Sequence, residues 1–258
     1  MVAGPPHLLP LDVLALAAFS PELAGLRPHI VTSATSATSA TSATSATSAT
    51  SDGPGPQGEA IDGYVGTTRI AARVVGIGLP MAAVGAARLI SELHPRAVIA
   101  VGTCGAYAGS GLAIGDVVVA RRVRLVDPGA LEGQSQFPHP MRVESDAHGR
   151  MAKGIARATG AKPADVATTL AITVDDASAG RIVRATGAAV EHLEAYGVAV
   201  ACASLATPFG AIFGVANFVG AGAREQWRLY HRDAEARATD AVLRWLRHSP
   251  QDFSPEAA

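Results

Sequence analysis

Apolar runs of strand length alternate with helix-like segments along this chain, and this alternation limits its fold more than any other feature. Strands that alternate with helices predict a largely parallel sheet covered by helices on both faces, which is an α/β fold. The segment 128–147 reads as an irregular loop. The predicted strands are 11–19, 69–78, 96–105, 116–126, 167–174 and 208–217, and the predicted helices are 80–93, 147–160, 192–206 and 224–248.

In such sheets ligands bind beyond the carboxyl ends of the strands, so the residues at those ends are the first candidates for a site. The first of them, SPELAGLR, reads as a helix start with Ser20 as N-cap and Pro21 at the first helical position. The candidate stretches are 20–22, 76–78, 102–105, 175–178 and Asn217.

A three-residue repeat of Thr, Ser and Ala fills residues 32–51. It contains no large apolar side chain, so ordering it would cost backbone entropy without burying anything. We therefore expect a disordered loop at 32–58, with a functional stalk or a glycosylated segment as the alternative. Residues 1–10 and 249–258 are predicted to be tails, and 11–248 a single domain that this loop interrupts.

The composition excludes several function classes. The formal net charge is -1, so no basic field exists to hold nucleic acid or an anionic membrane. The two cysteines give no disulfide framework, and the eight histidines show no metal-ligand spacing. The first apolar run has no preceding Lys or Arg and contains Asp12, so we read it as a core strand. We expect a cytoplasmic protein without metal or cofactor.

Two glycine-rich turns follow predicted strands. VVGIGLPM has Met81 where a dinucleotide fingerprint has its third glycine, and no phosphate-binding P-loop motif occurs, so nucleotide cofactors are disfavoured. VGTCGAY places glycines and small residues at the end of a central strand, where a flat ligand can lie against bare backbone. Cys104 within it reads as a packing residue rather than a nucleophile.

Five segments in order resemble the nucleoside phosphorylase/nucleosidase superfamily. They are AAFSPELAGLR, GIGLPMAAVGAARLI, VGTCGAYAGSGLAIGDVVVA, VEHLEAYGVAVAC and PFGAIFGVANFVG. The resemblance implies a three-layer α/β/α fold with a central, mostly parallel mixed sheet. It also implies cleavage of the N-glycosidic bond of nucleosides by phosphate or water, no cofactor, and a homo-oligomer.

Two differences within the resemblance favour water over phosphate. Phosphorylases carry a phosphate-binding arginine where this chain has Ala100. The first turn is similar to that of the hydrolytic branch, whose glutamate activates water and corresponds to Glu22. Taken alone, Glu22 also fits a solvated carboxylate that the helix dipole favours.

The VEHLEAY segment carries a second carboxylate. In hydrolytic relatives a methionine and a glutamate stand at the positions of Leu193 and Glu194, and the glutamate holds the ribose hydroxyls. The alternative for Glu194 is a structural glutamate at the N-terminus of the following helix. The spacing resembles the V-E-N-M-E of futalosine hydrolases, a branch of menaquinone biosynthesis, and is one residue longer than the V-E-M-E of methylthioadenosine/S-adenosylhomocysteine nucleosidases.

Asn217 stands where adenine-specific nucleosidases have an acidic aspartate, and futalosine hydrolases resemble this chain in having Asn. An amide is no general acid, but its NH2 suits a purine O6 and its C=O suits a protonated N7. That pairing fits hypoxanthine better than adenine. The alternative is that the Asn217 amide only forms hydrogen bonds with the backbone of the turn. Thr103 and Gly105 are expected to line the cleft, and Asp176 to Ser178 to edge the base.

The resemblance implies hydrolysis of a purine nucleoside, with futalosine as the expected substrate and hypoxanthine as a product. An adenosine-type nucleosidase is one alternative. A catalytically silent nucleoside-binding relative is the other, because Gly222 and Ala223 replace an Arg-Asp pair that the futalosine branch usually carries.

Overall fold

The computed structural model describes residues 10–31 and 60–248. The Thr-Ser-Ala repeat and most of both predicted tails lie outside the described residues, so the loop and tail predictions stay predictions. Within the described ranges, no helix combines the length and the apolar character that crossing a membrane requires.

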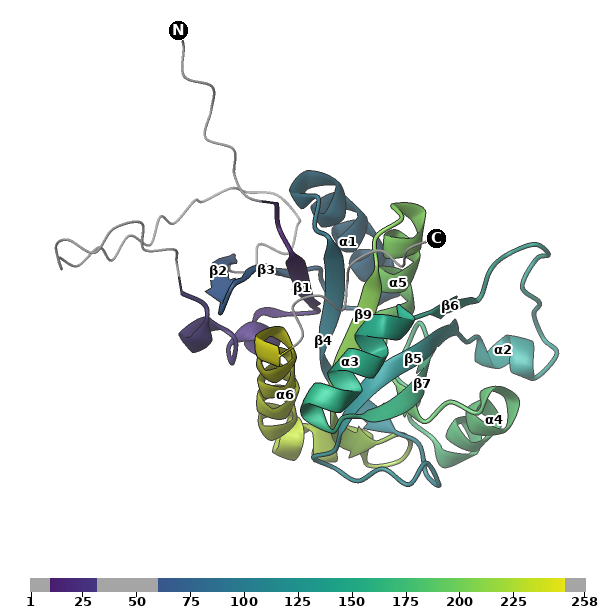
Figure 1. The fold of residues 1–258 in the computed structure, drawn as a ribbon. Helices are drawn as coiled ribbons and strands as arrows, with labels where there is room; N and C mark the ends of the chain where they lie inside the picture. The colour runs from purple at the N-terminus through teal and green to yellow at the C-terminus, as the bar shows by residue number, and fades with distance from the viewer. Residues whose placement is uncertain (1–9, 32–59, 249–258) are drawn as a thin grey trace, which may run out of the picture.

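Nine strands form one mixed sheet in the described part of the chain (Figure 1). Parallel pairs join β1 to β3 and β4, while β2 runs antiparallel to β3. The strands are β1 (Val13–Ala17), β2 (Ile61–Val65), β3 (Thr68–Val74), β4 (Ala97–Ala106), β5 (Val117–Leu125), β6 (Glu144–Asp146), β7 (Lys162–Thr168), β8 (Val190–Glu191) and β9 (Phe209–Phe218).

The sheet closes on itself, which an open three-layer sandwich does not do. β9 pairs with both β4 and β5, β5 pairs with β7, β7 with β8, and β8 with β4, so five strands form a ring. The predicted α/β fold and mixed sheet are confirmed. The predicted open three-layer arrangement is not observed, because part of the sheet closes into this ring. Ring closure depends on the antiparallel β5–β9 and β4–β8 pairs, which join segments far apart in the sequence.

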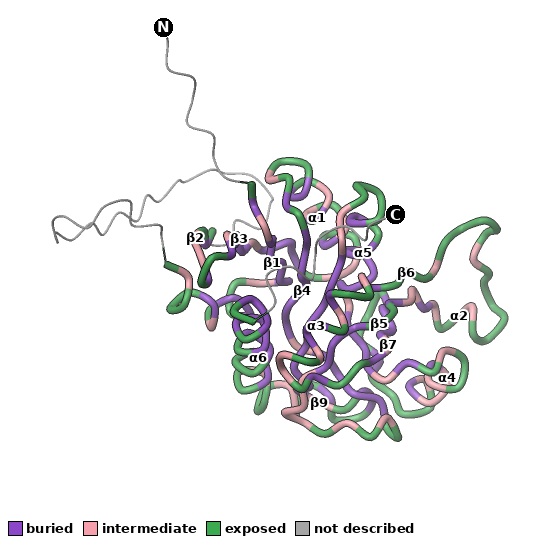
Figure 2. The backbone as a smooth tube through the Cα atoms, in the orientation of Figure 1, coloured by how far each residue is buried: buried purple, intermediate pink, exposed green. Residues whose placement is uncertain are grey.

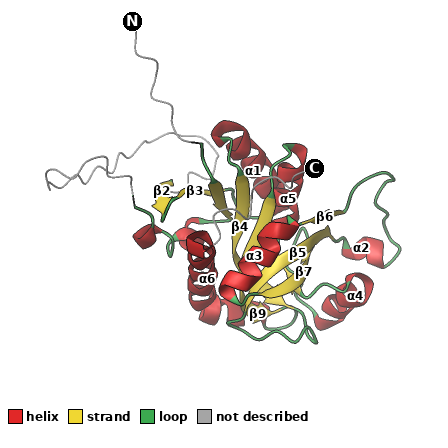
Figure 3. Cartoon of the chain, in the orientation of Figure 1, coloured by secondary structure: helices red, strands yellow, loops and turns green. Residues whose placement is uncertain are grey.

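Helices cover the strands from two sides (Figure 3). α1 packs against α5, and α3 packs against α6, each pair with its own group of buried apolar side chains. Figure 2 shows that the ring strands are buried over most of their length. The helices are α1 (Leu79–Leu93), α2 (Pro128–Leu131), α3 (Gly149–Thr159), α4 (Asp176–Thr186), α5 (Ala195–Ser204) and α6 (Ala223–His248), with 3-10 turns η1 (Ser20–Leu23) and η2 (Arg27–His29).

Some predicted elements are wrong. The expected helix start at Ser20 is the single 3-10 turn η1, whose N-cap residue is Phe19 and which has no side-chain cap. The strand predicted at 167–174 lies earlier, as β7, because residues 162–168 pair with β5. The expected loop at 128–147 contains α2 and β6.

Candidate active site

Glu22 is buried in η1, the turn that follows β1, with only 3% of its surface exposed. Its Oε2 accepts a hydrogen bond of 3.0 Å from the Ala18 N–H, and its Oε1 accepts one of 3.0 Å from the Thr103 N–H. Gly102 makes room for this carboxylate, because a Cβ there would lie 2.4 Å from Oε1. The bare backbone at the end of β4 therefore fixes the orientation of the Glu22 carboxylate.

Burial raises the pKa of Glu22 to about 8. The N–H of Thr103 opposes that shift, while the negative charge of Glu194 adds to it. The N–H of Ala18 also lowers the pKa, and the charge of Glu235 raises it. A carboxyl with such a pKa exchanges its proton near neutral pH, as a general base must.

Glu194 is also buried, at 7% exposed, directly before α5. Its Oε1 accepts a 2.7 Å hydrogen bond from the Gly78 N–H at the start of α1. Gly78 has a φ of 86°, a conformation that glycine adopts without strain. The two glutamates thus reach the same edge of the sheet from separate elements, and each is held by the backbone of a glycine-rich turn.

His192 lies beside Glu194. Its Nδ1 accepts a 3.2 Å hydrogen bond from the Glu194 N–H and lies 3.2 Å from Glu194 Oε2. The imidazole stacks on Phe213 with 3.9 Å between ring centroids. Burial lowers the pKa of His192, against the opposite effect of the Glu194 charge. His192 is therefore a neutral packing group that positions Glu194.

Thr103 links the site to α6. Its Oγ1 accepts a 3.2 Å hydrogen bond from the Trp227 Nε1–H. The Trp227 indole lies 6.5 Å from the Phe19 ring and stacks on His231 at 4.3 Å. The sequence alone did not place Trp227 in the site. The four-residue spacing of Trp227, His231 and Glu235 places them on one helix face. The fold, and not this spacing, brings Trp227 to Thr103.

Asn217 lies near the end of β9, opposite Gly105 of β4. A Cβ at Gly105 would lie 2.8 Å from Asn217 Nδ2, so the glycine makes room for the amide. The Nδ2–H donates to the Phe218 carbonyl at 2.9 Å. The structure thus brings Asn217 to the same strand end as Thr103, with one of its N–H groups bonded to local backbone.

Asp176 and Ser178, predicted to edge the base, begin α4. The Asp176 Oδ1 accepts a 2.9 Å hydrogen bond from the Ala221 N–H, which ties α4 to the turn that follows Asn217. The Ser178 N–H donates to the Asp175 carboxylate at 3.0 Å, and its Oγ accepts from Arg181 Nη2 at 2.8 Å. Both predicted residues therefore hold local structure beside the Asn217 turn.

The other residues of the VEHLEAY and VGTCGAY segments pack. Leu193 is half-buried between His192 and Glu194. Glu191, 7% exposed, accepts hydrogen bonds from the Tyr107 hydroxyl at 2.8 Å and the Thr173 hydroxyl at 2.6 Å. The Cys104 thiol is free and buried, and burial raises its pKa, which agrees with a packing role.

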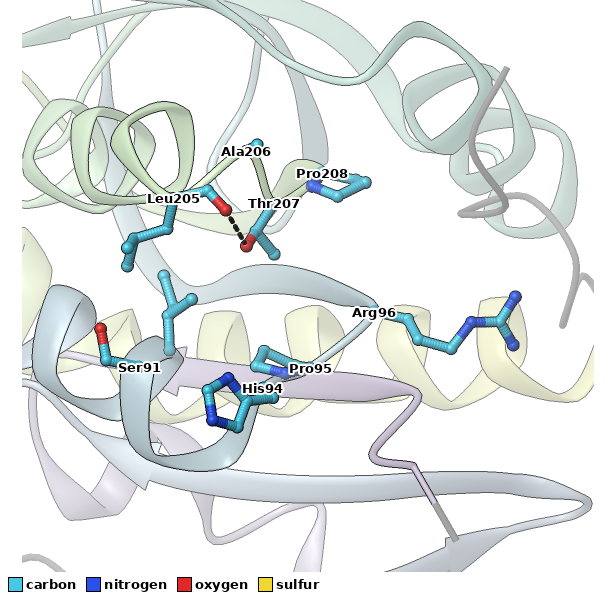
Figure 4. A pocket seen from close by; sticks show the side chains of 9 residues that line it. Ser91, His94, Pro95, Arg96, Leu205, Ala206, Thr207 and Pro208 are labelled. Carbon is cyan, nitrogen blue, oxygen red and sulfur yellow. Dashed lines mark hydrogen bonds between the residues drawn. The ribbon is translucent and has the colours of Figure 1, made fainter. Parts of the chain in front are cut away.

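A separate pocket lies at the opposite edge of the sheet (Figure 4). Its lining residues come just before β4 and β9 begin, whereas Glu22, Thr103 and Asn217 stand where strands end. It is therefore distinct from the glutamate site. The lining residues are Ile90, Ser91, His94, Pro95, Arg96, Leu205, Ala206, Thr207 and Pro208.

The site combines a buried proton acceptor, a second carboxylate and an amide at one edge of the sheet. Among the residues that the structure describes, no group of three or more His, Cys, Asp or Glu side chains is arranged to hold a metal ion. The arrangement suits acid–base chemistry by carboxyl groups on a ligand that carries hydroxyls and a flat polar ring.

Comparisons with known proteins agree with this picture. The chain is 32% identical over 184 residues to a futalosine hydrolase from Acidothermus cellulolyticus, which covers 67% of this chain and 74% of that protein. The methylthioadenosine/S-adenosylhomocysteine nucleosidase of Neisseria meningitidis in complex with methylthio-immucillin-A matches with a TM-score of 0.75 and 21% identity, over 92% of this chain and 99% of the other.

A futalosine hydrolase mutant of Helicobacter pylori matches with a TM-score of 0.73 and 13% identity, over 92% of this chain and 98% of the other. These two structures share the fold. The family model for the phosphorylase superfamily matches residues 28–248. The predicted family is thereby confirmed, and this chain belongs to the phosphorylase superfamily.

Proposed function

We propose that this protein hydrolyses the N-glycosidic bond of a purine nucleoside, with futalosine as substrate and hypoxanthine and dehypoxanthine futalosine as products, as a step of menaquinone biosynthesis. The observation that carries the proposal is the Glu22 carboxyl, which is buried, fixed by two backbone N–H groups and has a pKa of about 8. The pKa of such a group lies close enough to neutral pH for its ionised form to take a proton from water.

Water is the nucleophile in this account. Glu22 orients a water molecule and accepts its proton as the oxygen bonds to the anomeric carbon of the ribose, while the bond from that carbon to the purine nitrogen breaks and its electron pair leaves with the base. At the phosphorylase arginine position stands Ala100, a buried residue of β4 that supplies no cation for a phosphate dianion. Hydrolysis therefore fits the described residues of this site better than phosphorolysis.

Glu194 is the proposed ribose-binding group. Its Oε1 accepts one hydrogen bond from Gly78, and a carboxylate oxygen has further lone pairs for the ribose hydroxyls. Hydrogen bonds to an ionised carboxylate are strong and directional, so they fix the sugar ring relative to Glu22. Thr103 and Gly105, at the end of β4, line the space between sugar and base in this arrangement.

Asn217 is the proposed purine-recognition residue. One of its N–H groups is bonded to Phe218, which leaves a second N–H and the carbonyl for a ligand. A 6-oxopurine offers O6 as an acceptor and N7–H as a donor, and this pair complements the amide. Asn217 stabilises the leaving base by these hydrogen bonds, and water supplies the proton.

Futalosine is preferred over adenosine-type thioethers for two reasons. The matched relative from Acidothermus cellulolyticus is a futalosine hydrolase. Adenine presents a donor at C6 instead of an acceptor, so it pairs less well with the amide of Asn217. Leu193 and the turn at Asp176 and Ser178 complete the proposed pocket beside the base.

Purine release in phosphate-free buffer tests the proposal. The purified protein is incubated separately with futalosine, methylthioadenosine and inosine, and the released base is separated by chromatography. We expect hypoxanthine from futalosine and little or no adenine from methylthioadenosine. Adenine release alone would identify an adenosine-type nucleosidase, and no release from any nucleoside would indicate a silent binder.

A further inference from the structure

Glu235 is a buried carboxyl of α6 that the proposed chemistry does not use. Only 7% of the residue is exposed, and among the described residues its Oε1 has no hydrogen-bond partner. A buried, unpaired carboxylate oxygen is costly, so it calls for a physical reason. The residues around Glu235 should therefore explain why its carboxyl is buried without a partner.

Two close contacts fix the part of α6 that carries Glu235. A Cβ at Gly214 of β9 would lie 2.1 Å from the Ala234 carbonyl oxygen, and a Cβ at Gly25 would lie 2.3 Å from Thr239 Oγ1. Ala234 and Thr239 stand on either side of Glu235 along the helix. The helix therefore cannot rotate to bring this carboxylate into solvent.

The charge of Glu235 acts on Glu22, since it adds to the rise in the Glu22 pKa. α6 packs against η1, which carries Glu22. Burial raises the pKa of Glu235 as well, and the charges of His231 and Arg232 on the same helix oppose that rise. β9 has no titratable residue, and β4 has only Cys104.

We propose that Glu235 is a positioning residue of the hydrolytic site, a second buried carboxyl on the helix that packs against η1, whose negative charge opposes the ionisation of Glu22 and so helps to set the pH at which Glu22 acts as a base. The catalytic part of this inference rests on the function proposed above. Two ionised carboxylates in one buried region repel each other, so the pair keeps a proton until the pH is high enough to remove it. Among the described residues, the Oε1 of Glu235 has no hydrogen-bond donor to offset its charge, which strengthens this repulsion.

The first consequence concerns the titration of Glu22. Glu235→Gln removes a negative charge at nearly constant shape, so Glu22 should lose its proton at lower pH, by less than about one pH unit, because burial and the Glu194 charge act more strongly on the Glu22 pKa. Glu235→Asp keeps the charge and should retain most of the wild-type behaviour. Glu225→Gln, an exposed change on the same helix at a residue paired with Arg228, is the matched control and should shift nothing.

The experiment is a carbon-13 NMR titration of protein labelled at the glutamate side-chain carboxyls. Glu22→Gln assigns the Glu22 resonance by its disappearance. A lower titration midpoint in Glu235→Gln, with the wild-type midpoint in Glu225→Gln, supports the coupling. Equal Glu22 midpoints in wild type and Glu235→Gln would overturn it, and Glu235→Asp provides a second comparison if the Gln variant folds poorly.

The pH dependence of kcat/KM on futalosine is the parallel functional readout. Its acidic limb should move to lower pH in Glu235→Gln, while KM changes little because Glu235 does not touch the ligand. The titration needs no substrate. A shifted titration in a protein that releases no purine would therefore refute the proposed function and leave the coupling standing, so the two failures are distinguishable.

Discussion

At Glu22, two backbone N–H groups favour the ionised carboxylate and partly oppose the burial that raises its pKa. Ala18 supplies one of these groups and Thr103 the other. The balance leaves a pKa of about 8, in the range where a general base works. The site is built on small residues at strand ends, of which Gly102 is the clearest, because any side chain there would displace Glu22.

The raised pKa of Glu22 makes stability depend on pH. In the unfolded chain this carboxyl ionises near the ordinary glutamate pKa of 4.5, whereas in the folded chain it keeps its proton up to about pH 8. Its contribution is fully present below pH 4.5 and is lost as the pH rises towards 8. The loss is on the order of 4 kcal/mol.

Glu22→Gln should therefore gain stability relative to wild type between pH 5 and pH 9. Urea unfolding at both pH values measures the difference, in which contributions from other groups cancel. Equal pH dependence in the two proteins would show that Glu22 ionises normally in the folded state.

Asn217→Asp tests how the base is recognised. An aspartate at the end of β9 accepts from the adenine amino group and can donate a proton to N7, whereas it repels the O6 of hypoxanthine when ionised. We expect the ratio of kcat/KM for methylthioadenosine over futalosine to rise at least about tenfold, which corresponds to about 1.4 kcal/mol. An unchanged ratio would count against the proposed role of the amide, and Asn217→Ala serves as the control for simple loss of contact.

At the scale of elements, α6 packs against the strands and the turn that carry the site. It packs on β9, and its Trp227 bonds to Thr103 of β4. The contact between Gly214 and the Ala234 carbonyl involves backbone on the helix side, which cannot move without shifting the whole helix. Gly214 is therefore one of the two glycines, with Gly25, that set the position of this part of α6.

Gly214→Ala should destabilise the protein and displace α6. A Cβ that meets a backbone oxygen at 2.1 Å must be relieved by helix movement, at about 3 kcal/mol. Gly149→Ala is the control, because nothing lies within 4 Å of a Cβ there and its φ is not in the left-handed region. Denaturant unfolding and the intrinsic fluorescence of the two tryptophans of α6, Trp227 and Trp245, measure the two effects. Equal stability of both variants would contradict the packing described here.

The elements that could be predicted from sequence are those with strong local patterns. The strand that ends in Gly102 to Gly105 and the helix at 224–248 were predicted nearly as observed, because long apolar or amphipathic runs carry their own periodicity. The strand predicted at 167–174 was misplaced, since pairing with β5 selects 162–168 and leaves Leu170 and Ile172 exposed. β8, with two residues, has no local pattern at all.

The site residues also divide into those that the sequence indicates and those that only the fold reveals. Glu22, Thr103, Glu194 and Asn217 were singled out by the strand ends and the family resemblance, and the structure brings them to one edge of the sheet. Their roles stay predictions. Glu235 was missed because its importance comes from burial against η1, and helix periodicity marks only which face it occupies.

At the scale of the whole molecule, the ring of five strands separates two ends. Glu22, Glu194 and Asn217 occupy the end where β1, β4 and β9 finish, and the pocket at His94 and Thr207 occupies the end where β4 and β9 begin. Two of the ring strands, β4 and β9, carry no charged residue. The candidate site therefore lies at one edge, where glycine backbone meets the buried carboxyls of Glu22 and Glu194.

The central claim is that Glu22 drives hydrolysis of a purine nucleoside, and turnover of futalosine by Glu22→Gln in phosphate-free buffer tests it most directly. We predict that kcat falls by about 10²–10⁴-fold, the usual contribution of a general base, while hypoxanthine binding stays near the wild-type level. A wild-type protein that releases hypoxanthine together with a Glu22→Gln variant of near wild-type kcat would contradict the account.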